Sequence, residues 1–102
     1  MSVVVVATIL PRPEYRAEVI DALRQVIGQV QDEDGCELYA LHEAPDRLIL
    51  IEKWASHEAL TAHSAGPALA ELGQALAGQV AAAPDLLVLE PVPAGDPAKG
   101  LL

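Results

Sequence analysis

The order of the predicted strands and helices indicates an α+β protein with the ferredoxin-like arrangement β-α-β-β-α-β, in which helices cover one face of an antiparallel sheet. Four short stretches are rich in β-branched residues or leucine, and the stretches between them repeat apolar residues at helical spacing. A chain of 102 residues leaves room for one core only. We therefore expect one domain over residues 1–93 and a C-terminal tail over 94–102, which is rich in Pro, Gly and Ala.

The first predicted strand covers residues 3–10, an apolar run that stops at Pro11. It does not alternate polar with apolar residues, which predicts that both of its faces are buried. From residue 14 to about 31, apolar side chains recur three or four positions apart, and this spacing predicts a helix. Gly35 then supplies a turn.

Residues 36–43 and 48–54 are predicted to be two strands of a hairpin. The connection between them, residues 44–47, has Pro and Asp at positions that favour a tight turn. Because side chains alternate along a strand, Tyr39 is expected on the opposite face from Cys36.

Two short helices, over 56–64 and 67–79, and a last strand over 85–92 complete the predicted fold. Ser56 is a suitable N-cap, and Pro67 is tolerated at a first helical position. Helices on one side can cover only one face of the sheet. Since the first strand is apolar on both faces, we expect a homodimer in which two sheets pack against each other.

Composition and charge exclude several classes of partner. The net charge of −9, with six scattered basic residues, argues against nucleic acid and anionic membranes, which both attract a basic patch. Cys36 is the only cysteine, so no internal disulfide is expected. The first residues lack a leader of the signal-peptide type, and no apolar run approaches the roughly 20 residues of a membrane span. A cytoplasmic location is the simplest expectation.

An indole and an imidazole are expected to point into the same apolar interior. Trp54 ends the third strand, and His63 follows nine residues later on the apolar face of the next helix, together with Ala59 and Leu60. Two aromatic polar groups beside an apolar space predict a small-molecule pocket.

The chain resembles the antibiotic biosynthesis monooxygenase family in the order and spacing of several residues. These are Gly35-Cys36 before a strand, Tyr39 within it, Glu52-x-Trp54 closing the next strand, and His63 before Gly66-Pro67. The resemblance implies a dimeric α+β barrel of the quinol monooxygenase type. It also implies oxidation of a reduced aromatic, such as a quinol or an anthrone, by O2 without a bound cofactor.

His63 is the candidate catalytic base. An imidazole can accept a proton near neutral pH, and removing the proton of a phenol or quinol leaves an electron-rich phenolate that can reduce oxygen without metal or flavin. The alternative is a histidine at the edge of the core that bonds to a backbone carbonyl.

Four further residues are candidates for substrate binding. Trp54 could provide a flat wall and an N–H donor, and Tyr39 a hydroxyl group. Glu52 shares a strand face with Trp54 and could orient His63, or else form a surface ion pair with a cation such as Lys53 or Arg47. Thr8 could place a hydroxyl in the same space. Purely structural roles remain open for all four.

Other functions have weaker support in the sequence. Haem-degrading enzymes of the same superfamily resemble this chain in fold. An alignment on Gly66-Pro67 places His63 where they carry a tryptophan and Leu72 where they carry the axial histidine, and leucine cannot ligate iron. The first strand has no asparagine, and Val6 takes the position where they carry one. No metal-ligand spacing and no glycine-rich phosphate loop occurs, so neither a metal nor NAD, FAD or ATP is expected. The remaining alternative is a non-catalytic small-molecule-binding or structural dimer of the same fold.

Overall fold

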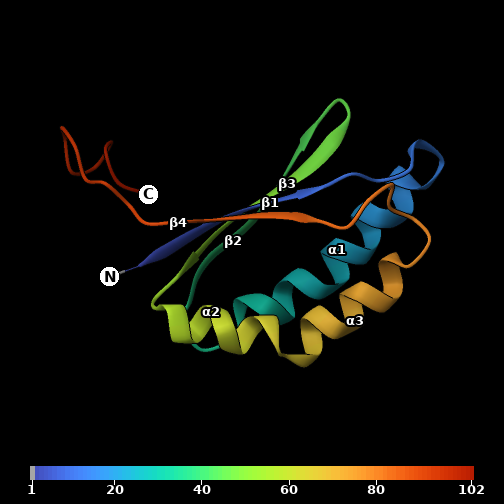
Figure 1. Cartoon of the computed structure of the whole chain (residues 1–102), viewed down its shortest axis with the longest axis horizontal. Coiled ribbons are helices and arrows are strands. Elements are labelled where there is room, and N and C mark those ends of the chain that lie inside the picture. The colour runs from blue at the N-terminus through green and yellow to red at the C-terminus, as the bar shows by residue number, and fades with distance from the viewer. Residues whose placement is uncertain (1) are drawn as a thin grey trace.

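The computed structural model describes residues 2–102 and has the predicted architecture. Four antiparallel strands form one sheet in the order β2-β3-β1-β4. They are β1 (Val3–Ile9), β2 (Cys36–Ala44), β3 (Arg47–Trp54) and β4 (Asp85–Leu89). The helices are η1 (Pro13–Tyr15), α1 (Arg16–Gln31), α2 (His57–Ser64) and α3 (Pro67–Leu76). The helices lie on one side of the sheet (Figure 1), which confirms the ferredoxin-like α+β prediction.

Two predicted ends were wrong, each for a local reason. The helix expected to reach residue 79 stops at Leu76, because Gly78 adopts φ +78°, a left-handed conformation that ends a helix. The strand expected over 85–92 stops at Leu89, since Pro91 has no N–H to donate to a strand ladder. Beyond β4 the chain leads away from the helices (Figure 1).

The core lies between the sheet and the helices. Along β1 every second side chain, from Val3 to Ile9, is buried against the helices, and the residues between them are half-buried on the other face. The prediction that both faces are buried therefore holds, within this chain, for the helix-covered face alone. Helix α1 contributes a matching stripe of Val19, Leu23, Val26 and Val30. Within residues 2–102, no helix is long and apolar enough to cross a membrane.

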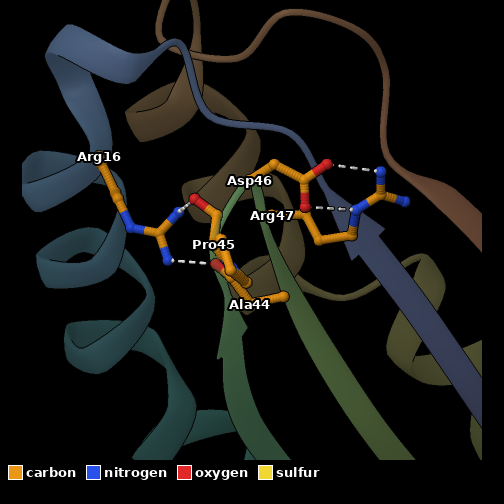
Figure 2. A network of polar contacts seen from close by, with 5 residues as sticks. All are labelled: Arg16, Ala44, Pro45, Asp46 and Arg47. Carbon is orange, nitrogen blue, oxygen red and sulfur yellow. Dashed lines mark hydrogen bonds and ion pairs between the residues drawn. The ribbon is translucent and has the colours of Figure 1, made fainter.

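Arg16 fixes the start of α1 over the β2–β3 turn. Its Nη2 donates to the carbonyl oxygen of Ala44 at 2.7 Å, and its Nη1 donates to that of Pro45 at 3.4 Å (Figure 2). On the other side of the turn, Asp46 and Arg47 pair with each other at 2.8 Å. These contacts tie the turn of the hairpin to the start of α1.

Helix α2 begins where the sequence predicts. The side-chain oxygen of Ser56 accepts a hydrogen bond from the backbone N–H of Ala59 at 3.1 Å, which satisfies one of the free donors of the first turn. Because the helix starts directly after β3, His63 is carried back over the helix-facing side of the sheet.

Candidate active site

A cavity of about 330 Å³ lies between the sheet and helices α2 and α3. Its volume is at the lower end of the range for ligand pockets, about 300–1,000 Å³. Four polar side chains line it: Tyr39, Glu52, His63 and Ser64. The other lining residues are apolar or glycine: Val5, Ala7, Ile9, Leu50, Leu60, Leu69, Leu72, Gly73, Leu76, Pro84, Leu86 and Val88. The cavity therefore suits a small, mostly apolar molecule.

His63 is buried and is held by a carboxylate. Its Nδ1 lies 2.7 Å from Oε1 of Glu33, in the turn between α1 and β2. A carboxylate can only accept, so Nδ1 carries the proton of this bond and the neutral ring has its lone pair on Nε2. Within residues 2–102, Nε2 has no hydrogen-bond partner. Every fully buried side-chain nitrogen and oxygen in these residues does have one, so Nε2 cannot be fully buried and retains accessible surface. Since His63 lines the cavity, Nε2 is the candidate atom for accepting a proton from a molecule bound there.

The partner of His63 was missed in the sequence. Glu33 belongs to a run of acids, Asp32 to Asp34, that was interpreted only as the polar end of the first helix. Nothing in the pattern distinguishes the middle acid from its neighbours. The signal that could have found it is Gly35, two residues further on, because its left-handed turn lies against α2 and so decides which acid faces that helix.

Gly35 lets this turn approach α2 closely. It adopts φ +81°, and a Cβ atom at this position would lie 2.5 Å from the Cβ of Ala59. A left-handed conformation and so short a contact both favour glycine. The close approach brings the carboxylate of Glu33 within reach of His63.

We expect Gly35→Ala to lower the free energy of unfolding by about 2–4 kcal/mol, through the left-handed conformation and the contact with Ala59. Urea unfolding followed by circular dichroism measures this loss. Gly28→Ala is the matched control. Gly28 lies within α1 with nothing near its Cβ position, so that change should stabilise the protein by about 0.5–1 kcal/mol. Equal effects of the two substitutions would contradict the close-packing argument.

Trp54 stacks on His63 and is not among the residues that line the cavity, so the structure does not bring it to the place of a substrate wall. Its side chain is fully buried, and the indole stacks on the imidazole with ring centroids 4.5 Å apart and planes at 28°. The indole N–H donates to Oε1 of Glu52 at 3.0 Å, so it is not available to a substrate oxygen. Tyr39 packs edge-on against both rings. The indole thus supports the imidazole from the side away from the cavity.

Glu52 is a buried cavity residue and forms no ion pair with any cation of residues 2–102. Of the two cations considered, Arg47 pairs with Asp46, and Lys53 points to the opposite face of β3. Glu33, and not Glu52, holds His63. Burial raises the pKa of Glu52, while the hydrogen bond from Trp54 and the charge of His63 act in the opposite direction.

The raised pKa of Glu52 predicts a pH-dependent effect of Glu52→Gln. The folded state keeps the proton to a higher pH than the unfolded state, so above about pH 4.3 wild-type stability is lost as pH rises through the folded pKa. Glutamine removes this loss and still accepts from Trp54. The unfolding free energy of Glu52→Gln relative to wild type should therefore increase from pH 4.5 to pH 7.

Urea titrations at several pH values test this. Glu71→Gln changes the same charge on the exposed side of α3 and should show no such trend. A difference between Glu52→Gln and wild type that is constant with pH would contradict the raised pKa.

The remaining two candidate residues lie on opposite faces of the sheet. Tyr39 lines the cavity, and burial, followed by the charges of Glu52 and Glu33, raises the pKa of its phenol far above the usual value. Its hydroxyl keeps its proton and can donate to a ligand. Thr8 alternates with Ala7 and Ile9, which face the cavity, so its hydroxyl is directed to the other side of the sheet. The structure therefore does not bring Thr8 together with the other candidate residues.

The two positions compared with haem-degrading enzymes, Leu72 and Val6, do not lie together in the structure. Leu72 lines the cavity but offers no ligand for iron, and Val6 lies on the sheet face that does not line the cavity. Within the described residues 2–102, no group of three or more His, Cys, Asp or Glu side chains is arranged to hold a metal ion.

The fold and the site together define a small α+β protein with an apolar cavity, open past β4, and a His–Glu pair at its edge. Residues 2–75 match the model of the family described as antibiotic biosynthesis monooxygenase. The chain belongs to this family, which confirms the resemblance seen in the sequence.

Relatives from several bacteria share both sequence and fold. The chain is 32% identical over 89 residues to "Probable quinol monooxygenase YgiN" of Escherichia coli K12, a match that covers 74% of this chain and 86% of the relative. It is 37% identical over 67 residues to Rv0793 of Mycobacterium tuberculosis, covering 64% of this chain and 66%, just under two thirds, of that relative. The solved structure of Rv0793 superposes with a TM-score of 0.85 at 28% identity, over 94% of this chain and 100% of the other.

Proposed function

We propose that the protein is a cofactor-independent monooxygenase that oxidises a reduced aromatic, a quinol or an anthrone-like compound, with O2. The observation that carries this proposal is His63, whose Nδ1 is bound by Glu33 at 2.7 Å while the ring lines an apolar cavity. Membership of a monooxygenase family and the similarity to YgiN, named a quinol monooxygenase, support the same reaction class.

In the proposed reaction His63 starts the chemistry by removing a proton. Nε2 accepts the proton of a substrate hydroxyl, and Glu33 stabilises the imidazolium that forms, as the acid of a His–carboxylate pair does. The resulting phenolate transfers an electron to O2, and the two radicals combine to form a carbon–oxygen bond. The peroxide takes up the proton held by His63, and its O–O bond breaks as the carbon that carries it loses its C–H proton and forms a C=O bond. One oxygen atom stays in the product and the other leaves as water, so a quinol becomes a hydroxyquinone and an anthrone becomes a quinone.

The apolar walls of the cavity serve this chemistry. With few polar groups nearby, a phenolate is poorly solvated and is a stronger reductant toward oxygen, which is itself apolar. Tyr39, which keeps its proton, can donate a hydrogen bond to the oxygen of the ring. These residues would therefore hold the substrate, and His63 would be the catalytic base.

Oxygen consumption by metal-free protein tests the proposal over a panel of quinols and anthrones. We expect saturable uptake above autoxidation, with one O2 consumed per product and one atom of isotopically labelled oxygen retained in it. Uptake no faster than autoxidation across the panel would overturn the oxygenase and favour a non-catalytic ligand-binding dimer of the same fold.

We infer in addition that the open face of the sheet packs against a second copy of the chain. This face carries Val6 and Ile51, which are paired across β1 and β3 and half-buried, and Leu87 and Leu89 of β4, which are 54% and 43% exposed. The same apolar sheet face on two copies is complementary to itself, which allows a two-fold, sheet-on-sheet dimer.

Light scattering during gel filtration should give the mass of a dimer for the wild type. Ile51→Lys places a charge in the centre of the face and should shift the mass to that of a monomer. Val92→Lys, at a residue that is 84% exposed beyond β4, is the control and should remain dimeric. A monomeric wild type at micromolar concentration would rule out this interface.

A further inference from the structure

We propose that the cavity selects neutral ring compounds that enter with an uncharged oxygen first, and that it rejects carboxylates of the same size. This inference deepens the proposed function and rests on it for the assumption that this cavity is the substrate site. It is carried by the position of the polar side chains at one end of the cavity and by the signs of the charges around it.

The cavity has a polar inner end and an apolar mouth. Tyr39 and Glu52 are paired across β2 and β3, in the half of the sheet away from β4, and both are at least 96% buried. At the other end Leu86 and Val88 of the edge strand β4 line the cavity and are 59% and 51% exposed. A ligand that enters past β4 brings its leading group to Glu52, Tyr39 and His63, and leaves its apolar part against Leu86 and Val88.

Among residues 2–102, no Lys or Arg side chain lines the cavity to compensate a negative charge at its inner end. Lys53 points to the opposite face of the sheet, and Arg16 is bound at the hairpin turn. The one positive charge that could form is on His63, and Glu33 already lies 2.7 Å from its Nδ1. A buried carboxylate would thus lie beside Glu52 without a partner, which is costly in an apolar site.

A neutral hydroxyl or carbonyl finds complementary groups at the same place. Nε2 of His63 can accept from a hydroxyl, and the phenol of Tyr39 can donate to an oxygen. Glu52 has one oxygen bound by the Trp54 N–H, and its other oxygen is free of any hydrogen bond within residues 2–102. The site therefore distinguishes an uncharged oxygen from an anion by the absence of a counter-ion.

Calorimetric binding under anaerobic conditions tests this selectivity without turnover. The probes are 1-naphthol, which is neutral at pH 7, and 1-naphthoate, which has the same ring system and a negative charge. We expect naphthol to bind at least about tenfold more tightly. In Glu52→Gln the amide can donate to a carboxylate, and the preference should fall by at least about threefold. Glu71→Gln makes the same charge change on the exposed face of α3 and should leave the preference unchanged.

Equal affinities for the two probes, or no binding of naphthol at about 1 mM, would overturn the inference. An equal change of preference in both Gln variants would do so too, since it would assign the effect to net charge. The proposed function fails separately: a naphthol preference without oxygen uptake on any quinol would remove the oxygenase and keep the selective cavity. Oxygen uptake together with tight naphthoate binding would keep the oxygenase and remove the selective cavity.

Discussion

His63→Gln is expected to reduce oxygen uptake, measured above autoxidation, by about 100-fold or more, the usual contribution of a positioned general base. Glutamine has a similar size and its amide N–H can still donate to Glu33, so the packing against Trp54 is largely kept. What it lacks is a basic nitrogen toward the cavity. The loss should therefore appear in kcat, with a smaller change in KM.

His57→Gln is the matched control for this change. His57 belongs to the same helix, is exposed and lies 3.3 Å from Glu90 at the surface, away from the residues that line the cavity. Its uptake rate should equal that of the wild type. If His63→Gln also retained the full rate while circular dichroism showed a folded protein, the assignment of His63 as the base would be wrong.

Trp54→Ala is expected to lower the free energy of unfolding by about 3–5 kcal/mol. Trp54 is fully buried and among the largest such side chains, and it packs on both His63 and Tyr39. Its removal also leaves the buried Glu52 without its hydrogen-bond donor. A domain of this size is stable by about 5–15 kcal/mol, so a large share of the stability would be lost.

Urea unfolding by circular dichroism measures this effect without the tryptophan signal. Trp54→Phe keeps an aromatic ring and removes the N–H, and should cost about 1–3 kcal/mol, the penalty of one unsatisfied buried group. Val92→Ala at an exposed site should change stability by at most about 0.5 kcal/mol. A loss as small as that for Trp54→Ala would contradict the packing described for the site.

The fold was predictable because its signals are local. The period of apolar residues in α1, the cap at Ser56 and the turn before Arg47 each depend on neighbours in sequence. The two predicted ends that were wrong, at residues 79 and 92, also have local causes. A single glycine and a proline decide them, and hydrophobic periodicity does not register either residue.

The site was only partly predictable. A helical position on the apolar face correctly placed His63 toward the interior, and strand alternation placed Glu52 on the face of Trp54. The expectation that Tyr39 lies opposite Cys36 was wrong, because a register shift between Cys36 and Leu38 pairs Cys36 with Trp54 and Tyr39 with Glu52, on one face. In β1, alternation puts Thr8 on the face away from the cavity. The sequence did not show this, because an almost entirely apolar strand gives no pattern that tells its two faces apart. Register with β3 and β4 was needed to assign them.

By itself the sequence determined the order of the elements, the family and the presence of an imidazole on the inner face of α2. The contacts of this imidazole follow from the packing of the whole chain: Glu33 holds it, Trp54 stacks on it, and Glu52 accepts the N–H of Trp54. Glu33 and His63 are 30 residues apart, and they meet because Gly35 permits a turn to approach a helix. Such contacts depend on how elements pack, and hydrophobic periodicity specifies which face is buried but not which side chains meet there.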